Sequence, residues 1–171
     1  MVARGDMGVE IPFEKIPAIQ KDLIHKGYNA GKQVITATQM LESMIMNPRP
    51  TRAEITDVAN AIYDGTSAIM LSGETAAGKY PVLAVKTMAT IAENTEKNIH
   101  YDRRFLSSQF KIKNTVDAIS HATCGMSIDI AAKAIAVCSL SGMTARMVSR
   151  FRPPVDIVGL TTSEKTWRKL A

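Results

Sequence analysis

A strand–loop–helix pattern, repeated within the first hundred residues, limits the folds open to this chain more than any other feature. Val34 and Ile35 predict a short buried strand, which a polar loop and an amphipathic helix follow. Residues 1–3 are typical of the end of an earlier strand, and residues 68–71 predict a third. Short links between such units are typical of right-handed βαβ connections, so the sequence predicts an α/β fold with a parallel sheet. The pattern alone permits either part of a barrel or an open, doubly wound sheet.

The helix after the second strand has clear start and stop signals. Thr51 and Glu54 have the spacing of a capping box, and Gly65 is a typical helix stop. Residues 36–49, before this helix, are predicted to contain no helix of their own. Residues 72–80 are predicted to form the next polar loop, which leads into another amphipathic helix.

The segment before the second strand is predicted to turn and then to form a helix. Residues 4–8 place two glycines around an acid, which is typical of a turn. A helix is predicted beyond Pro12, and the glycines at 27 and 31 end it. Its apolar residues recur at helical spacing and are expected to face a core: Ile16, Ile19, Leu23 and Ile24.

A change of composition near residue 98 predicts a domain boundary, because helical periodicity lapses there and charged and hydroxyl side chains accumulate. We predict one domain over residues 1–98, a linker over 99–113 and a second domain over 114–171. Asn114 is expected to cap the first helix of the second domain. Two strands, over residues 134–137 and 155–160, and two further helices make this domain α/β as well. The apolar stripe of its first helix is expected to consist of Val116, Ile119, Thr123, Met126 and Ile130.

Composition excludes several classes of protein. The chain has 171 residues, 46% of them hydrophobic, so it can bury a substantial core, but no apolar run approaches the roughly 20 residues that cross a bilayer. Arg4 and Asp6 interrupt the N-terminus, which is therefore not typical of a signal peptide. Two cysteines are too few for a disulfide scaffold or a zinc site, which favours the cytoplasm. The net charge of +5 comes from scattered Lys and Arg with 5% aromatic residues, which argues against a nucleic-acid partner.

Four longer motifs carry a resemblance. They are Ala-Thr-Gln-Met-Leu-Glu-Ser-Met (37–44), Pro-Arg-Pro-Thr-Arg-Ala-Glu (48–54), Ile-Met-Leu-Ser-Gly-Glu-Thr-Ala (69–76) and the opening twelve residues around Arg-Gly-Asp. Together they resemble pyruvate kinase. The resemblance implies the last part of a (β/α)8 TIM barrel, followed by the first part of an α/β C-terminal domain.

The resemblance also implies an activity and its cofactors. Members of the family transfer phosphoryl from phosphoenolpyruvate to ADP, giving pyruvate and ATP in glycolysis, with Mg²⁺ or Mn²⁺ and with K⁺. The family's catalytic lysine, its K⁺ ligands and most of its nucleotide contacts precede the Arg-Gly-Asp segment. This chain alone is therefore expected to be inactive, and the complete protein is expected to be a homotetramer.

Site residues carry over from the family by motif. Asp6 corresponds to the metal ligand, the backbone amides of Gly5 and Asp6 to the groups that hold the substrate carboxylate, and Thr38 to a hydroxyl near the carbon that gains a proton. Ser72 and Glu74, which follow the third strand, are expected to be further catalytic residues in the same polar site. Without the family, each has a simpler interpretation: a turn acid at Asp6, a backbone-bonded hydroxyl at Thr38, a helix cap at Ser72 and a surface acid at Glu74.

Two loops support alternative functions. Residues 73–79 match the P-loop pattern except that Tyr80 stands where Ser or Thr should hold magnesium, so a nucleotide-binding protein is one alternative. The second loop lies at a predicted strand-to-helix junction, a geometry that offers backbone amides to an anion. In many pyruvate kinases this loop binds a sugar-phosphate effector, so a non-catalytic phosphometabolite-binding module is the other alternative. The candidate effector-binding residues are Ser139, Ser141, Gly142 and Thr144.

Overall fold

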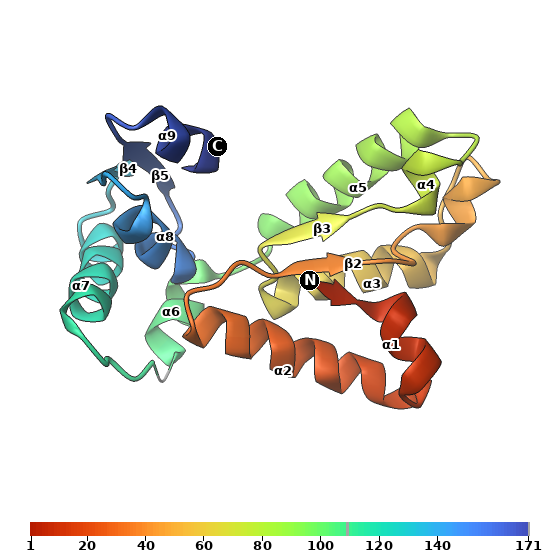
Figure 1. Ribbon diagram of the computed structural model, residues 1–171, viewed down its shortest axis with the longest axis horizontal. Helices are drawn as coiled ribbons and strands as arrows, with labels where there is room; N and C mark the ends of the chain where they lie inside the picture. Colours follow the sequence, from red (N-terminus) through yellow and green to blue (C-terminus); the bar gives the residue numbers. More distant parts are fainter. Residues whose placement is uncertain (109, 171) are drawn as a thin grey trace. The chain divides into compact units, whose positions relative to one another are not determined.

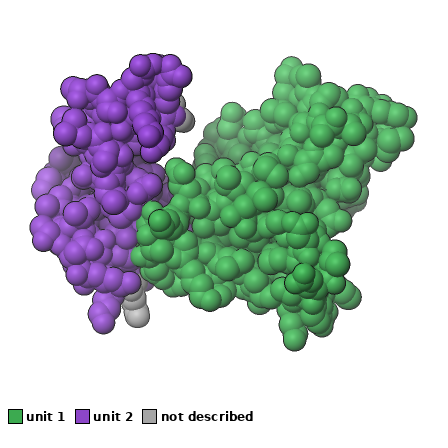
Figure 2. Space-filling view, in the orientation of Figure 1, with its two compact units in different colours: residues 1–99 green, residues 100–171 purple. Residues whose placement is uncertain are grey.

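The computed structural model describes residues 1–108 and 110–170, and the chain divides into two compact units. Unit 1 comprises Met1–Ile99 and unit 2 comprises His100–Ala171 (Figure 2). Each unit has a parallel sheet of its own and its own buried apolar residues.

The sheet of unit 1 has three parallel strands in the order β1-β2-β3. They are β1 (Val2–Ala3), β2 (Ile35–Ala37) and β3 (Ala68–Met70). Ala3 pairs with Ala37, and Ala37 pairs with Met70, so the strands end level with one another. In Figure 1 the arrowheads of β2 and β3 accordingly point the same way, toward α1 and α4. The predicted parallel α/β pattern is confirmed.

Helices connect these strands and form the main core of unit 1. The longer ones are α2 (Ile16–Asn29), α3 (Arg52–Asp64) and α5 (Pro81–Glu96), and α3 packs against α5. The loop after β2 contributes to the same core as these two helices. The buried cluster consists of Met40, Leu41, Met44, Val58, Ala61, Ala84 and Met88. Because Met40, Leu41 and Met44 are fully buried, the loop that follows β2 is anchored in the core.

Three segments predicted without helix contain short helices. Residues 4–8 belong to α1 (Arg4–Glu10) and not to a turn, residues 42–45 form the 3₁₀ helix η2 (Glu42–Ile45), and residues 73–76 form α4 (Gly73–Ala76). A further 3₁₀ turn, η1 (Phe13–Lys15), precedes α2. In η2 the helix forms because of a tertiary contact: the 3₁₀ turn places the Met44 side chain in the core. Such contacts give no periodic signal in the sequence.

The buried face of α2 differs in part from the predicted one. Ile24 is buried, but Leu23 is 37% exposed and Gln20 is only 5% exposed. Gln20 Nε2 donates a hydrogen bond to Asp64 Oδ2 on α3 at 3.1 Å, which satisfies a polar side chain inside the protein. The prediction failed at this position because the partner lies 44 residues away.

Both ends of α3 form as the sequence predicts. Thr51 accepts a hydrogen bond from the Glu54 N–H, and the Glu54 carboxylate accepts one from the Thr51 N–H, completing the capping box. Gly65 ends the helix with φ at 90°, a left-handed conformation that glycine adopts without a Cβ clash. The Glu54 carboxylate also accepts hydrogen bonds from the Ser43 N–H and hydroxyl, both at 2.6 Å. One side chain therefore both caps α3 and holds the loop after β2.

The hydrogen bonds to Glu54 predict a pH-dependent loss of stability. Burial raises the pKa of Glu54, but hydrogen bonds from Ser43 and Thr51 outweigh burial and leave the pKa below its usual value of 4.5. A lowered carboxyl pKa stabilises the fold above pH 4.5, and this stabilisation is lost as the pH falls through the folded-state pKa. Glu54→Gln is therefore expected to lower the free energy of unfolding by about 2 kcal/mol at pH 7.

Urea unfolding followed by circular dichroism at a series of pH values between neutrality and pH 3 provides the measurement. The difference between wild type and Glu54→Gln should be constant near neutrality and should shrink in acid. Glu93→Gln, which changes an exposed carboxylate on α5, is the matched control and should show no such trend. A pH-independent difference for Glu54→Gln would contradict the role of the carboxylate charge.

Unit 2 contains α6 (Tyr101–Ser107), α7 (Thr115–Asp129), β4 (Ala134–Cys138), α8 (Met143–Arg150), β5 (Asp156–Leu160) and α9 (Glu164–Leu170). β4 and β5 pair in parallel, with Ala134 opposite Asp156 and Cys138 opposite Leu160. Helix α6 lies within the segment that was predicted to be a linker without helix. It is held by Phe105, which is 5% exposed and whose ring lies 4.7 Å from His121 and 5.9 Å from Phe151.

Helix α7 begins at the predicted cap but buries a different face. Asn114 accepts a hydrogen bond from the Asp117 N–H, as the sequence predicts. The buried residues, however, are Asp117, Ser120, Cys124 and Ser127. Four of the five residues of the predicted apolar stripe are between 41% and 68% exposed, namely Val116, Ile119, Met126 and Ile130. The side chains on the buried face are small, which permits close packing against α8.

A buried ion pair determines which face of α7 is turned inward. Arg150 Nη2 donates to Asp117 Oδ1 at 2.8 Å, and both side chains are less than a tenth exposed. The hydrogen bond from Arg150 is the main cause that holds the pKa of Asp117 below its usual value. The guanidinium also lies over the rings of Phe110 and Phe151, 4.4 and 4.7 Å from their centroids. On the same face, burial raises the pKa of the Cys124 thiol to about 11, which makes it unreactive.

Candidate functional site

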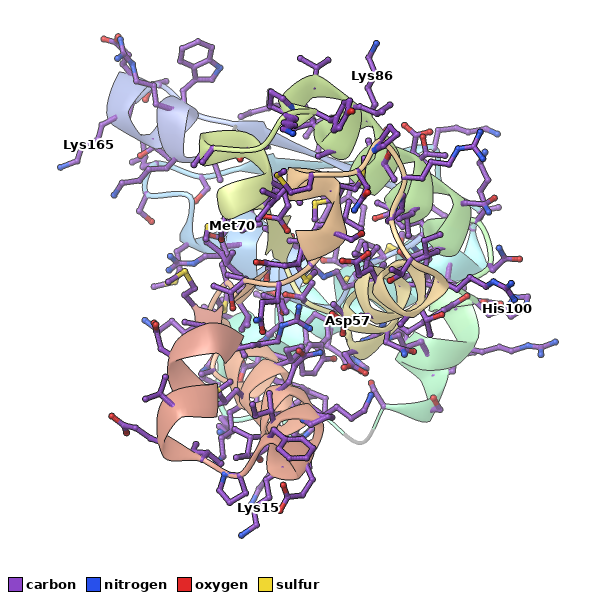
Figure 3. The ribbon with its side chains drawn as sticks, turned by 90° about the vertical axis from the view of Figure 1, so that its right-hand side faces the viewer. Lys15, Asp57, Met70, Lys86, His100 and Lys165 are labelled. Atoms are coloured by element: carbon purple, nitrogen blue, oxygen red, sulfur yellow. The ribbon has the colours of Figure 1, made fainter. Side chains whose placement is uncertain are left out.

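The candidate site lies where the three strands of unit 1 end. Arg4 and Gly5 directly follow β1, Thr38 follows β2, and Ser72 comes two residues after β3. The strands end level with one another, so these residues share one edge of the sheet. In parallel α/β folds this edge is where ligands bind. Figure 3 looks onto this side of unit 1, with Met70 of β3 and Asp57 of α3 labelled.

Thr38 has an unusual backbone and two hydrogen bonds through its hydroxyl. Its φ is 71°, and that of Gln39 is 53°, so two successive residues with side chains are left-handed. The Thr38 hydroxyl donates to the Ala37 carbonyl at 2.6 Å and accepts from the Gly5 N–H at 2.8 Å. The structure therefore brings together Gly5 and Thr38, two of the predicted substrate-binding residues. A Cβ built on Gly5 would lie 3.5 Å from this hydroxyl oxygen.

Glu74 is a fully buried carboxylate that joins two of the loops. Its Oε1 accepts from the Leu41 N–H at 2.9 Å, and its Oε2 accepts from the Ser72 N–H at 2.7 Å. The simpler interpretation of Glu74 as a surface acid is therefore wrong. Two backbone N–H groups satisfy this carboxylate, and in return it fixes the loop after β2 relative to the loop after β3.

Ser72 lies at the start of α4 but does not cap it through its side chain. Its Oγ is buried and has no hydrogen-bond partner among the residues that the structure describes. The simpler interpretation of Ser72 as a helix cap is therefore also wrong. A buried hydroxyl without a partner is costly, which is consistent with a group that bonds to a ligand or a water.

Asp6 lies in the first turn of α1, and its side chain is exposed at the same end of the sheet. A carboxylate there can supply one hard oxygen ligand to a divalent cation. Within residues 1–108 and 110–170, no three His, Cys, Asp or Glu side chains cluster as a metal site would require. The described residues fit a metal only as a partial site to which Asp6 supplies one ligand.

The P-loop interpretation of residues 73–79 finds no support in the geometry. In a P-loop, free backbone N–H groups surround a phosphate. Here the loop has folded into α4, and Glu74 already takes the Ser72 N–H. A Cβ on Gly78 would approach the Glu74 carbonyl to 2.3 Å, which explains the second glycine of the motif by close packing. Further N–H groups are also donated internally, namely those of Thr75, Ala76, Ala77 and Lys79.

The loop after β4 has the predicted position before a helix. Gly142 has φ at 76° and directly precedes α8, and the Ser141 hydroxyl accepts from the Met143 N–H at 3.3 Å. The Ser139 N–H donates to the Leu160 carbonyl, which ties this end of the loop to β5. Ser141 is exposed and Thr144 is partly buried. The predicted effector-binding residues thus lie on one loop, and their function stays a prediction.

The sequence did not reveal that Arg4 and Asp57 bind each other at the site. Arg4 Nη1 donates to both carboxylate oxygens of Asp57 on α3, at 2.7 and 2.6 Å. Its Nη2 donates to the Thr38 carbonyl at 2.7 Å. The pair is 53 residues apart, and no local pattern could indicate it.

Two models of known protein families match the chain. The model described as pyruvate kinase, barrel domain, matches residues 1–85, and the model described as pyruvate kinase, alpha/beta domain, matches residues 117–171. The chain belongs to the pyruvate kinase family. The resemblance predicted from the motifs is confirmed, as is the partial barrel followed by a partial α/β domain.

Individual relatives agree with the family models. The chain is 57% identical to a pyruvate kinase of Clostridium acetobutylicum, over 100% of this chain and 36% of that protein. It is 56% identical to one of Staphylococcus epidermidis, over 100% of this chain and 29% of that protein. The crystal structure of a pyruvate kinase from Cryptosporidium parvum matches 98% of this chain and 34% of its own, with 46% identity and a TM-score of 0.93. The chain thus spans about a third of the length of the pyruvate kinases it matches.

Over the described ranges, no helix combines the length and the apolar character needed to cross a bilayer.

Proposed function

We propose that this chain works as part of a pyruvate kinase that transfers phosphoryl from phosphoenolpyruvate to ADP, giving pyruvate and ATP. The observation that supports this most directly is the contact between the Gly5 N–H and the Thr38 hydroxyl at the ends of β1 and β2. It joins a backbone amide suited to an anionic substrate to a hydroxyl suited to a proton relay. The Ser72 hydroxyl, which has no hydrogen-bond partner among the described residues, follows β3, the strand next to β2.

Each residue of the site has a distinct proposed role. Asp6 supplies one ligand to Mg²⁺ or Mn²⁺, and a metal bound there neutralises charge on the transferring phosphoryl. The N–H groups of Gly5 and Asp6 are in the first turn of α1, where N–H groups have no acceptor within the helix. They hold the substrate carboxylate, with Gly5 sharing its N–H between the carboxylate and Thr38. Thr38 and Ser72 position the relay for the proton that enolpyruvate receives, and Glu74 holds their loops together.

The wider assignments follow from the family. We propose that the complete protein is a homotetramer that acts in glycolysis in the cytoplasm and requires K⁺, whose ligands lie outside this chain. We also propose that the loop containing Ser139, Ser141, Gly142 and Thr144 binds the phosphate of a sugar-phosphate effector. The position of this loop directly before α8 supports that assignment, because backbone N–H groups there can bind an anion.

The experiment that tests the proposal is Thr38→Val in the complete enzyme. This substitution keeps the shape of the side chain but removes the hydroxyl. We expect the incorporation of a solvent proton into pyruvate to fall about 10²-fold, the range typical of general acid–base groups. Phosphoryl transfer measured separately should fall less, because Thr38 is not assigned to the metal or the phosphates.

Thr36→Val is the matched control. It makes the same chemical change on β2, but the Thr36 hydroxyl donates to Thr66 Oγ1 at 2.9 Å and is fully buried away from the site. This variant should affect stability more than the ratio of proton exchange to phosphoryl transfer. If Thr38→Val slows both steps equally, or neither, Thr38 has no part in the relay.

A further inference from the structure

We propose that Arg4 is a positioning residue, which together with Asp57 holds Thr38 and Gln39 in the left-handed turn that presents the Thr38 hydroxyl to Gly5. This inference rests on the proposed function, because it assigns Arg4 and Asp57 to the geometry of the relay. Arg4 itself does not contact the reacting atoms under this proposal.

The guanidinium of Arg4 makes contacts in two directions. Toward α3, Nη1 donates to both oxygens of Asp57. Toward the turn, Nη2 and Nε both donate to the Thr38 carbonyl, at 2.7 and 3.2 Å, and Nη2 also donates to the Gln39 carbonyl at 3.2 Å. The Arg4 side chain is only 10% exposed, so little water competes for these bonds.

The turn needs such a partner. A left-handed backbone is unfavourable for residues with a Cβ, and more so for a β-branched residue such as Thr38. Such conformations persist only where the surrounding structure holds them in place. The turn also directs the carbonyls of Thr38 and Gln39 toward Arg4, which satisfies both acceptors.

Two consecutive residues, Arg4 and Gly5, bind both the backbone carbonyl and the side-chain hydroxyl of Thr38. The side chain of Arg4 binds the Thr38 carbonyl, and the N–H of the next residue, Gly5, binds the Thr38 hydroxyl. A shift of β1 relative to β2 would therefore disturb both contacts together. Because β1 and β2 are paired directly, this shift is opposed by the sheet.

Helix α3 also holds the loop after β2 at a second point. Asp57 anchors Arg4 at the start of the loop, and Glu54, one turn earlier on α3, accepts the Ser43 N–H and hydroxyl further along it. Lysine is a poor replacement for Arg4. The planar guanidinium directs donors toward the carboxylate and the two carbonyls at once, whereas an ammonium has three donors on a single nitrogen.

The test uses Arg4→Lys and Asp57→Asn in the complete enzyme, with Asp64→Asn as the matched control. Asp64 is also on α3, and its carboxylate accepts hydrogen bonds from Lys21 and Gln20 on α2. Arg4→Lys and Asp57→Asn are each expected to lower proton incorporation into pyruvate about tenfold, with KM for phosphoenolpyruvate changed less than about twofold. Asp64→Asn should leave this rate unchanged.

A double-mutant cycle separates positioning from general destabilisation. In the Thr38→Val background, Asp57→Asn should cost less than about twofold, because the group it positions is already absent. An equal loss in both backgrounds would overturn the inference, and so would wild-type proton exchange in Arg4→Lys.

Amide hydrogen exchange supplies a readout that does not depend on catalysis. The Gly5 amide should exchange about tenfold faster in Asp57→Asn than in Asp64→Asn, since its acceptor Thr38 is no longer held. Unchanged protection of Gly5 would refute the inference even if the enzyme were inactive. A wild-type complete protein that forms no pyruvate would instead refute the proposed function.

Discussion

Asp6→Asn in the complete enzyme is expected to lower kcat by about 10²- to 10³-fold, equal to about 3 to 4 kcal/mol, and to raise the Mg²⁺ concentration needed for half-maximal activity. The neutral amide keeps the size of the side chain but removes the negative charge that a hard cation prefers. Asp6 is exposed, so the substitution removes no buried contact from the fold. The effect should therefore be on the metal and not on folding.

Steady-state kinetics at a series of Mg²⁺ concentrations provides the measurement. Asp22→Asn is the matched control, since Asp22 is an exposed acid on α2 that pairs with Lys26. The control should have wild-type kinetics, and both variants should unfold at the wild-type temperature. A normal Mg²⁺ dependence in Asp6→Asn would remove Asp6 from the metal site.

Local rules predicted the framework of unit 1 well, because its signals lie within a few residues of one another. The capping box of Thr51 and Glu54, the stop at Gly65 and the strands around Ile35 and Ile69 all depend on short spacings. Parallel pairing then follows from the order of strands and helices. This is why the ends of the strands, and so the location of the candidate site, could be inferred without the structure.

Contacts between distant residues explain what the sequence did not reveal. The buried carboxylate of Glu74 accepts a hydrogen bond from Leu41, which is 33 residues away. Arg4 binds Asp57, which is 53 residues away. In unit 2 the ion pair of Arg150 with Asp117 turns the small face of α7 inward, against its apolar periodicity. A hydrophobic stripe predicts the buried face only where a polar pair does not compete for it.

The same reversal leaves unit 2 with apolar surface toward solvent. In addition to the exposed stripe of α7, one face of the β4–β5 sheet is open, with Val158 48% and Leu160 49% exposed. In each sheet the outer strands have no second neighbour within the described ranges, and such edges pair readily with other chains. Exposed apolar side chains of this kind favour association.

The isolated 171-residue chain is therefore expected to form no pyruvate above blank in the presence of Mg²⁺ and to be larger than a monomer by light scattering. Its described residues supply only Asp6 toward a metal, and Arg4 is already engaged by Asp57 and the loop, so charge on a transferring phosphoryl would remain unneutralised. Ile119→Lys with Val158→Lys, which place charge on the two exposed apolar faces, should reduce association without producing turnover. A compact wild-type monomer with measurable turnover would contradict both the assigned site and the expected association.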